Sequence, residues 1–314
     1  MILDNLKISL EAVAPMFLIM AVGFFVRRKG LLSEDDVRHM NKMVFLTLFP
    51  PLMFANLYGK ELSHVLDLKL VIYTLAAIAV VYALTLAFVL KVEKSPRSRG
   101  AMIHAIYRSN FVIMGLPIVS NIFGSENLAV TSMMVTIVVP VFNVMAVTTL
   151  EVFRGGKPNP LQILKGVSRN PLILGALAGV IAVLIDLQLP VFLEKTVSMM
   201  SGAATPVSLL LLGASFNIQS IERCRRNLIF CLLGRLVIVP AIALTGGILM
   251  GFRDVALVTL IAIFASPTAV SSFTMAQQMD SDDELAGNCV IFSSMFSCFT
   301  MFLWIFAFKS MGLF

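Results

Sequence analysis

The chain has 314 residues, of which 58% are hydrophobic and 13% are charged, and its formal net charge is +6. Its mean hydropathy of +0.92 excludes an ordinary soluble globular domain and predicts a polytopic helical membrane protein whose solvent is the lipid bilayer. The basic balance does not indicate a nucleic-acid partner. The basic residues lie in short connections between apolar blocks, where topology and anionic lipid headgroups account for them.

Apolar blocks of about 20 residues recur along the chain, the length needed to cross a bilayer core of roughly 30 Å. We predict an all-α fold of ten membrane-spanning helices with no separate extramembrane domain. The predicted spans are residues 8–26, 37–58, 68–90, 101–122, 128–153, 171–187, 190–216, 228–251, 254–278 and 285–308. The connections after the first, third, fifth and seventh spans carry most of the Lys and Arg residues, so the positive-inside rule places both termini outside the cytoplasm.

The two halves of the chain share short matches at one offset, which predicts an internal repeat. Phe49-Pro50-Pro51-Leu52 precedes Thr205-Pro206-Val207-Ser208 by 156 residues, residues 124–129 precede 281–286 by 157, and Ser109-Asn110 precedes Ser266-Pro267 by 157. Residues 1–157 and 158–314 each contain five predicted spans. Because five is odd, the second copy would enter the membrane from the opposite side, as in the inverted repeats of secondary transporters.

Spans four and nine are the predicted broken helices, which in such repeats cross near the bilayer midplane. Polar or helix-breaking residues interrupt both spans: Arg108, Ser109, Asn110, Gly115 and Pro117 in the first, and Ser266, Pro267 and Thr268 in the second. We predict that the helices break at Gly115 and Pro117 and at Pro267, because a proline lacks the N–H of a helical hydrogen bond. The half-helix N-termini formed at such breaks favour an anion.

Motifs spread over the whole chain resemble the auxin efflux carrier family, which contains plant PIN-type auxin carriers and bacterial carriers often called malonate transporters. The matching motifs are Asn41-Lys42, Pro50-Pro51-Leu52, Asn110 with Met114-Gly115-Leu116-Pro117, Arg169-Asn170-Pro171, Ala204-Thr205-Pro206, Leu212-Gly213, Ser266-Pro267 and Val290-Ile291-Phe292. Ser109 stands where the plant members have a proline, and the long central loop of many plant members is short here. The resemblance is therefore closer to a bacterial carboxylate carrier than to a carrier of indole-acetate.

The resemblance implies two inverted five-helix repeats, with a scaffold from spans 1, 2, 6 and 7 and a transport part from spans 3–5 and 8–10. It implies elevator-type or rocking alternating access to a small organic anion, in the cytoplasmic membrane of a bacterium. A homodimer through the scaffold helices is a family-level expectation. The sequence does not identify the substrate or the direction of transport.

The candidate substrate-binding residues lie on or near the two broken spans: Asn110, Arg108, Ser109, Ser266, Pro267, Thr268 and Asn143. Arg108 either binds a carboxylate, extends to the cytoplasmic headgroups, or pairs with another intramembrane group. The serine and threonine hydroxyls face the same choice between substrate and their own helix backbone. Asn143 is either a pocket wall or an interhelical hydrogen-bond partner, whereas a structural role is expected for Arg235.

Cofactors and metals are not expected, because the Cys and His residues show no CxxC, HExxH or comparable spacing. Glu11 and Glu151 are acidic residues inside the apolar spans, and both lie near span ends, away from the predicted crossing, so proton coupling, sodium coupling and uniport all stay open. Two alternatives to a transporter are a membrane receptor or sensor for a small anion and an intramembrane enzyme. The enzyme would need a nucleophile–base or metal constellation that the sequence does not contain.

Overall fold

The computed structural model describes residues 2–59, 67–124, 127–155 and 160–314, with side chains from residue 14 onward except that of Met114. The described chain is helical, and its single β-type pairing is one isolated bridge. Its helices are α1 (Ile2–Arg28), α2 (Glu34–Met43), η1 (Val44–Leu48), α3 (Phe49–Ala55), α4 (Leu68–Val92), α5 (Pro96–Tyr107), α6 (Phe111–Phe123), α7 (Leu128–Val152), α8 (Pro160–Ser168), α9 (Pro171–Leu184), α10 (Val191–Ser215), α11 (Ile218–Leu233), η3 (Gly234–Ile238), α12 (Val239–Leu249), α13 (Asp254–Ala265), α14 (Ser271–Gln278) and α15 (Asp283–Ser310).

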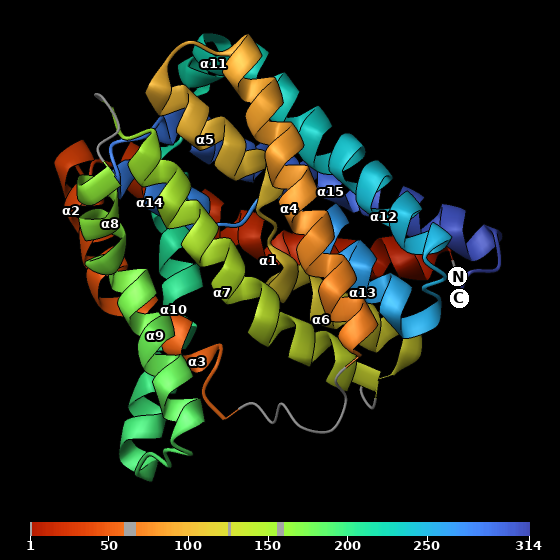
Figure 1. Cartoon of the computed structure of the whole chain (residues 1–314). Helices are drawn as coiled ribbons and strands as arrows, with labels where there is room; N and C mark the ends of the chain where they lie inside the picture. Colours follow the sequence, from red (N-terminus) through yellow and green to blue (C-terminus); the bar gives the residue numbers. More distant parts are fainter. Residues whose placement is uncertain (1, 60–66, 125–126, 156–159) are drawn as a thin grey trace.

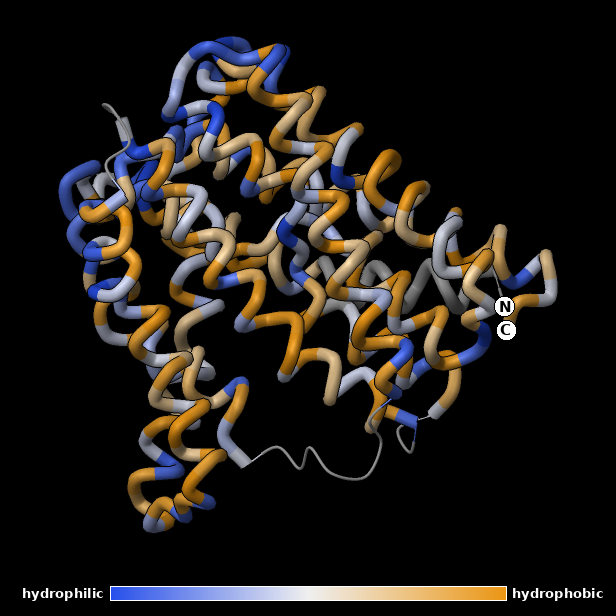
Figure 2. Tube along the Cα trace, in the orientation of Figure 1, coloured by the Kyte–Doolittle hydropathy of each residue, from blue (hydrophilic) through white to orange (hydrophobic). Residues whose placement is uncertain are grey.

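Five helical segments in the described ranges are long and apolar enough to cross a membrane: α4, α7, α10, the continuous Ile218–Leu249 and α15. The pair α8 and α9, bent by 59°, would make a sixth as one broken span. An all-helical membrane protein is therefore confirmed, and Figure 2 shows long hydrophobic stretches with hydrophilic residues gathered toward the upper left. The ten-span inverted repeat stays a prediction, and its boundary at residues 157 and 158 lies outside the described residues.

Two groups of helices each have their own hydrophobic core. The larger core is built from buried residues of α4 to α7 and α11 to α15, with Phe252 from a connection. The second combines α2, η1, α3, α9 and α10 with a few residues of α7 and α14. Figure 1 shows α3, α9 and α10 together at the lower left of the view. α1 packs along α10, where a Cβ at Gly23 would collide with the carbonyl of Leu210 and one at Gly213 with the carbonyl of Met20.

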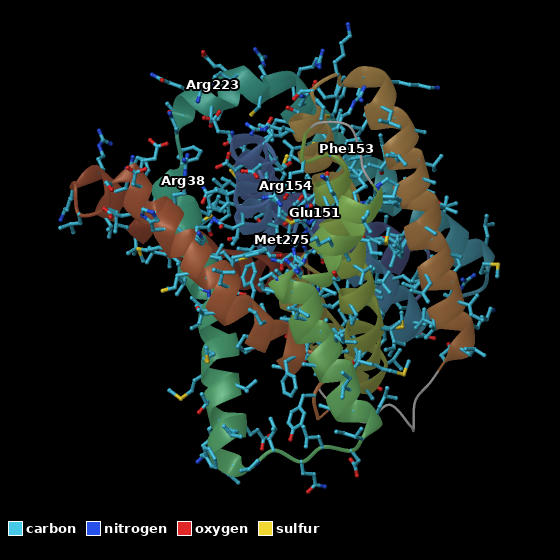
Figure 3. The ribbon with its side chains drawn as sticks, turned by 60° about the vertical axis from the view of Figure 1, so that its left-hand side comes forward. Arg38, Glu151, Phe153, Arg154, Arg223 and Met275 are labelled. Atoms are coloured by element: carbon cyan, nitrogen blue, oxygen red, sulfur yellow. The ribbon has the colours of Figure 1, made fainter. Side chains whose placement is uncertain are left out.

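The connections after the first, third, fifth and seventh predicted spans meet at one end of the protein, together with the acidic connection at residues 280–284. Their ion pairs are Arg27–Glu34 at 3.9 Å, Arg226–Glu93 at 3.0 Å, Arg154–Asp280 at 2.8 Å and Arg223–Glu284 at 2.6 Å. Figure 3 shows Arg154 beside Glu151, the residue that it also pairs with at 3.3 Å. This end therefore gathers the basic connections, as the charge pattern predicts.

Two π-helical turns precede prolines within predicted spans. η1 is followed by Pro50, and η3 by Pro240. A proline inside a helix leaves the carbonyl four residues before it without its usual donor. For Pro240 this is the carbonyl of Leu236, which accepts the indole N–H of Trp304 at 3.3 Å. The local widening thus accommodates the proline while its freed backbone group keeps a partner.

The chain breaks in spans four and nine, but the first break is not at the predicted position. α5 ends at Tyr107 and α6 starts at Phe111, so the break is Arg108–Asn110; Pro117 and Gly115 lie inside α6. The second break is residues 266–270, and Pro267 lies in it. The physical reason is that one missing N–H only weakens a helix, whereas the backbone of Ser109 and Asn110 finds partners at the opposite break. Gly115 instead permits close packing, since a Cβ there would lie 3.0 Å from the Cβ of Ala262 on α13.

Candidate functional site

The two breaks meet through backbone hydrogen bonding. Ser109 and Thr268 form the isolated antiparallel bridge, and the N–H of Asn110 donates to the carbonyl of Pro267 at 2.7 Å. The N–H of Thr268 donates to the Ser293 hydroxyl at 3.0 Å. Backbone groups that left the helices at the breaks are therefore satisfied within the protein, which is the condition for irregular backbone at membrane depth.

Arg235 stabilises this crossing from one side. It is fully buried and donates five hydrogen bonds, all to backbone carbonyls at the ends of α5 and α13. The acceptors are Ile106 at 3.2 Å, Tyr107 at 2.9 Å, Ile263 at 3.1 Å, Phe264 at 2.6 Å and Ser266 at 2.8 Å. The C-terminal end of a helix is negative, so one guanidinium offsets two such ends together. Arg235 thus has the structural position that the sequence predicts for it.

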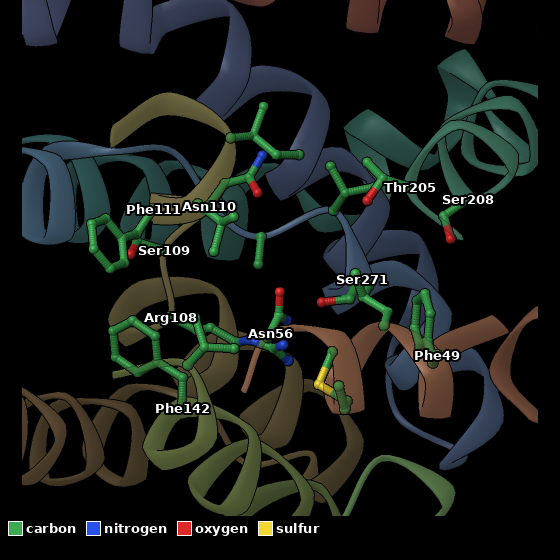
Figure 4. A pocket seen from close by; sticks show the side chains of 17 residues that line it. Phe49, Asn56, Arg108, Ser109, Asn110, Phe111, Phe142, Thr205, Ser208 and Ser271 are labelled. Carbon is green, nitrogen blue, oxygen red and sulfur yellow. The ribbon is translucent and has the colours of Figure 1, made fainter. Parts of the chain in front are cut away.

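A cavity of about 100 Å³ lies beside the crossing, between the two groups of helices. Its lining combines α3, α7 and α10 with both breaks and the first residues of α6 and α14. The lining residues are Phe49, Leu52, Met53, Asn56, Arg108, Ser109, Asn110, Phe111, Val112, Ile113, Val139, Phe142, Thr205, Ser208, Ala269, Val270 and Ser271. In Figure 4 the side chain of Arg108 extends toward Asn56, and Thr205 and Ser208 lie on the other side of the cavity.

Arg108 is 5% exposed and has only neutral partners among the described residues. Its Nη2 donates to Asn143 Oδ1 at 2.6 Å, and its Nη1 lies 3.0 Å from His104 Nε2 and 2.8 Å from Met275 Sδ. A thioether sulfur is a weak acceptor, and none of the three groups carries a negative charge. The buried guanidinium does not reach the basic end of the protein, so snorkelling does not describe this structure. Its contacts with Asn143, His104 and Met275 are those of the alternative in which it pairs within the fold, and substrate binding stays a prediction.

Polar groups beside Arg108 lack partners among the described residues. Ser109 and Asn110 are both less than 9% exposed. The Ser109 hydroxyl and the Asn110 Nδ2 have no hydrogen-bond partner there. The N-terminal turns of α6 and α14 also reach the cavity, and neither has a side-chain cap. Unpaired donors, two helix N-termini and a guanidinium form a surface suited to an anion that accepts hydrogen bonds.

The other predicted site residues support the crossing and do not line the cavity. The Ser266 hydroxyl donates to its own helix at Ala262, and the Thr268 hydroxyl donates to the Ala105 carbonyl at 2.9 Å. Pro267 contributes its carbonyl to the crossing. Asn143 orients Arg108 and donates to Met53 Sδ at 2.6 Å, so it is an interhelical partner one residue beyond the cavity-lining Phe142.

Several residues at the site were not singled out from the sequence. Asn56 and Ser271 line the cavity, as do Thr205 and Ser208, which the sequence marked only as members of repeat or family motifs. A signal existed for Ser271, which follows the break at Pro267 by one helical turn. His104 has no metal-ligand spacing in the sequence, but its spacing of four residues from Arg108 brings the two side chains together.

Comparison with known proteins gives a consistent result over nearly the whole chain. The sequence model of the family described as "Membrane transport protein" matches residues 8–161 and 160–305. An "Uncharacterized transporter" of Methanothermobacter thermautotrophicus is 26% identical over 300 residues, covering 94% of this chain and 97% of the relative. A "Putative malonate transporter" of Rhizobium meliloti is 22% identical over 305 residues, covering 92% of each chain. The chain therefore belongs to the membrane transport protein family, the auxin efflux carrier family whose motifs it carries.

Proposed function

We propose that this membrane transporter is a secondary carrier of a small organic carboxylate, with Arg108 as the partner of the carboxylate group. One observation carries the proposal: a buried guanidinium lines a cavity without a carboxylate partner among the described residues. An unpaired buried charge is costly, and removing the counterion of a buried ion pair typically costs about 3–5 kcal/mol. A bound carboxylate would supply the missing charge and can accept two parallel N–H bonds from the guanidinium.

The size of the cavity favours a small substrate over an indole-sized one. Its volume is about 100 Å³, and one buried water needs roughly 10–15 Å³ of such space, so the cavity matches a ligand of several heavy atoms. Asn56, Ser271 and Ser208 offer further hydrogen bonds around it. A short mono- or dicarboxylate fits these features, and malonate, which appears in the name of one relative, is the natural first probe.

The position of the cavity supports alternating access. It lies where α3 and α10 of one helix group face α7 and the two breaks of the other, so a movement of one group against the other would open it to either side. We extend the proposal to ten spans in two inverted repeats, with spans 3–5 and 8–10 as the moving part and elevator-type or rocking motion. In this proposal both termini are outside the cytoplasm.

The test is uptake of radiolabelled malonate by proteoliposomes containing wild-type protein, Arg108→Gln or Arg225→Gln. Gln keeps hydrogen-bonding capacity but removes the charge, and Arg225 is an exposed arginine that serves as the matched control. We expect saturable uptake by wild type and Arg225→Gln, and a loss of at least tenfold for Arg108→Gln, whose elution as folded protein is checked separately.

Two results would argue against this assignment. Uptake by folded Arg108→Gln at the wild-type rate would remove Arg108 from the site. If neither malonate nor other short carboxylates are transported or bound by wild type, the substrate class itself is wrong.

A further inference from the structure

His104 is a buried histidine placed directly against the guanidinium of Arg108. It is 1% exposed, lies one turn before Arg108 on α5, and its Nε2 is 3.0 Å from Arg108 Nη1. Its other ring nitrogen, Nδ1, is buried and has no hydrogen-bond partner among the described residues. The mechanism of anion binding proposed above uses Arg108 but leaves this imidazole without a role.

The contact with Arg108 determines the protonation state of His104 in this structure. A guanidinium can only donate hydrogen bonds, so Nε2 must be the acceptor and must carry no proton. The imidazole is therefore neutral, with its single proton on Nδ1. If Nε2 took up a proton, it could no longer accept from Arg108, and two cations would face each other at 3.0 Å. Protonation of His104 and the Arg108–His104 hydrogen bond exclude each other.

No neighbouring helix offers His104 an acidic partner among the described residues. The groups next to His104 along the chain are Arg108 and Tyr107, whose ring centroid is 6.2 Å from the imidazole. From the neighbouring helices, Met275 on α14 and Asn143 on α7 contact Arg108, and the acidic residue of α7, Glu151, pairs with Arg154 at the helix end.

The other helices packed against α5 carry Tyr82 on α4, Arg235 in η3, Cys231 on α11 and Cys289 on α15. Their acidic residues are Glu222 on α11 and Asp283 and Glu284 on α15, where Asp283 accepts from Gln277 and Glu284 pairs with Arg223. Neither ring nitrogen of His104 contacts any of these groups, so no carboxylate of the described residues holds an imidazolium there without the substrate.

We infer that His104 is the proton-binding site of a proton-coupled anion carrier, an inference that rests on the proposed function. A carboxylate that binds Arg108 replaces His104 as the acceptor for Nη1 and adds a negative charge beside both groups. Nε2 is then free to take a proton from water in the open cavity, and the imidazolium is stabilised by the bound anion. After the cavity opens to the other side, the anion leaves, Arg108 returns to Nε2, and the proton is released to water.

This arrangement also sets the charge of the transported species. With neutral His104 the site offers one positive charge, which balances a monocarboxylate. With protonated His104 it offers two, which balance both carboxylates of a dianion such as malonate. The coupling between the anion and the proton is reciprocal. If the bound anion raises the proton affinity of His104 by some factor, the bound proton raises the anion affinity of the site by the same factor.

The experiment counts protons taken up when malonate binds to the purified full-length protein. Calorimetric titrations in pairs of buffers with different ionisation enthalpies are run from about pH 6 to about pH 8, where an imidazole changes charge. Wild type, His104→Gln and, as the matched control, the exposed His39→Gln are compared. The Gln Oε1 can still accept from Arg108, but it cannot bind a proton at these pH values.

We expect wild type and His39→Gln to take up close to one proton per malonate beyond the uptake seen with His104→Gln. As pH increases over this range, the apparent Kd of wild type and His39→Gln for malonate should increase by up to about tenfold per pH unit. The Kd of His104→Gln should change little with pH. Equal proton uptake by wild type and His104→Gln, or no uptake by wild type, would overturn the inference while Arg108-dependent malonate binding stands. If His104→Gln does not fold, the wild-type Kd decides: a flat pH profile overturns the inference, and a rising one supports it.

If wild type binds no malonate at any pH, the proposed function fails and the inference fails with it. The two failures are thus separated by whether Arg108-dependent binding is observed at all.

Discussion

Arg108 and Arg235 are two buried arginines on either side of one helix crossing, and their surroundings differ completely. Arg235 donates five hydrogen bonds to carbonyls at the ends of α5 and α13. Arg108 contacts an amide oxygen, an imidazole nitrogen and a thioether sulfur, and it faces a cavity. The first charge is satisfied by the fold, whereas the second is available to a ligand. We propose that this difference separates a structural charge from a functional one.

The largest effect is expected on stability when Arg235 is removed. In Arg235→Met the five carbonyls lose their donor in a buried place, and a buried polar group left unsatisfied costs about 1–3 kcal/mol. The breaks of spans four and nine would lose their shared support. We expect little folded protein, or a melting temperature at least 10 °C below wild type (an effect on the order of several kcal/mol), measured by fluorescence-detected size-exclusion after heating.

For the Arg235 prediction, the exposed Arg225→Met is the control. A melting temperature for Arg235→Met that matches this control would mean that the crossing does not depend on Arg235, and the contrast between the two arginines would disappear.

The opposite pattern is expected for Arg108, with a large effect on binding and a small one on stability. Removing the charge in Arg108→Gln relieves an unpaired buried cation, so the melting temperature should stay near wild type or rise. Hydrogen bonds to charged groups contribute about 1.5–3 kcal/mol, so malonate affinity should fall by roughly 10- to 100-fold. Arg108→Lys, which keeps the charge but loses the bidentate geometry, should be intermediate. Isothermal calorimetry on all three proteins tests the order.

Smaller effects are expected at the polar groups that line the cavity without partners. Asn110→Ala and Ser109→Ala each remove one neutral hydrogen bond to the anion, about 0.5–1.5 kcal/mol, or roughly 2- to 10-fold in Kd. Thr268→Val should instead lower the melting temperature more than it changes Kd, because its hydroxyl is bound to the Ala105 carbonyl. A large increase in Kd for Thr268→Val, with an unchanged Kd for Asn110→Ala, would show that Thr268, not Asn110, contacts the substrate.

The smallest effect is expected on stability when Glu93 is changed. Glu93 is a buried charge whose hydrogen bonds are satisfied, as those of Arg235 are, but it lies at the polar end of the protein. Burial acts to raise the pKa of Glu93, but hydrogen bonds from the Ser95 N–H, the Asn227 amide and the Lys94 N–H, with the charge of Arg226, hold that pKa below its usual value. Because the folded-state pKa is lowered, the stabilisation is present above the unfolded carboxyl pKa of about 4.3 and is lost as pH falls through the folded pKa.

Glu93→Gln should therefore lower the melting temperature by a few degrees at neutral pH (about 1 kcal/mol) and match wild type in acid. Melting temperatures measured across pH for wild type, Glu93→Gln and the exposed Asp35→Asn give the comparison. A constant difference between Glu93→Gln and wild type at all pH values would mean that the carboxylate charge is not what stabilises this connection.

Composition and the spacing of apolar blocks were sufficient to predict a helical membrane protein, because a bilayer core of roughly 30 Å sets the length and residue type of its spans. The family was predicted from the resemblance of the motifs around Asn110, Pro117 and Pro267. The meeting of the two broken spans was also predictable from the matched offset of Ser109-Asn110 and Ser266-Pro267. The position of the first break was not. Pro117 marks a helix that tolerates a missing donor, whereas the actual break at Arg108–Asn110 depends on hydrogen bonds from a segment about 160 residues away.

The roles of the two arginines could not be separated reliably from sequence either. Arg108 follows Arg99 by nine residues and Arg235 follows Arg226 by nine, so spacing from the basic end is the same. What differs is which helix ends surround each guanidinium, and that is set by tertiary packing. The same reason explains His104, which gains significance only through its contact with Arg108, and the hydroxyl groups of Ser266 and Thr268, which bind backbone.

The most direct test is a crystal structure with bromomalonate, whose bromine gives an anomalous signal. We predict a peak in the cavity between Arg108 and Ser271, with carboxylate oxygens about 2.8 Å from the guanidinium. We also predict that Arg108 Nη1 no longer contacts His104 Nε2. A bound bromomalonate elsewhere, with the Arg108–His104 contact unchanged, would contradict the claim that Arg108 is the anion partner.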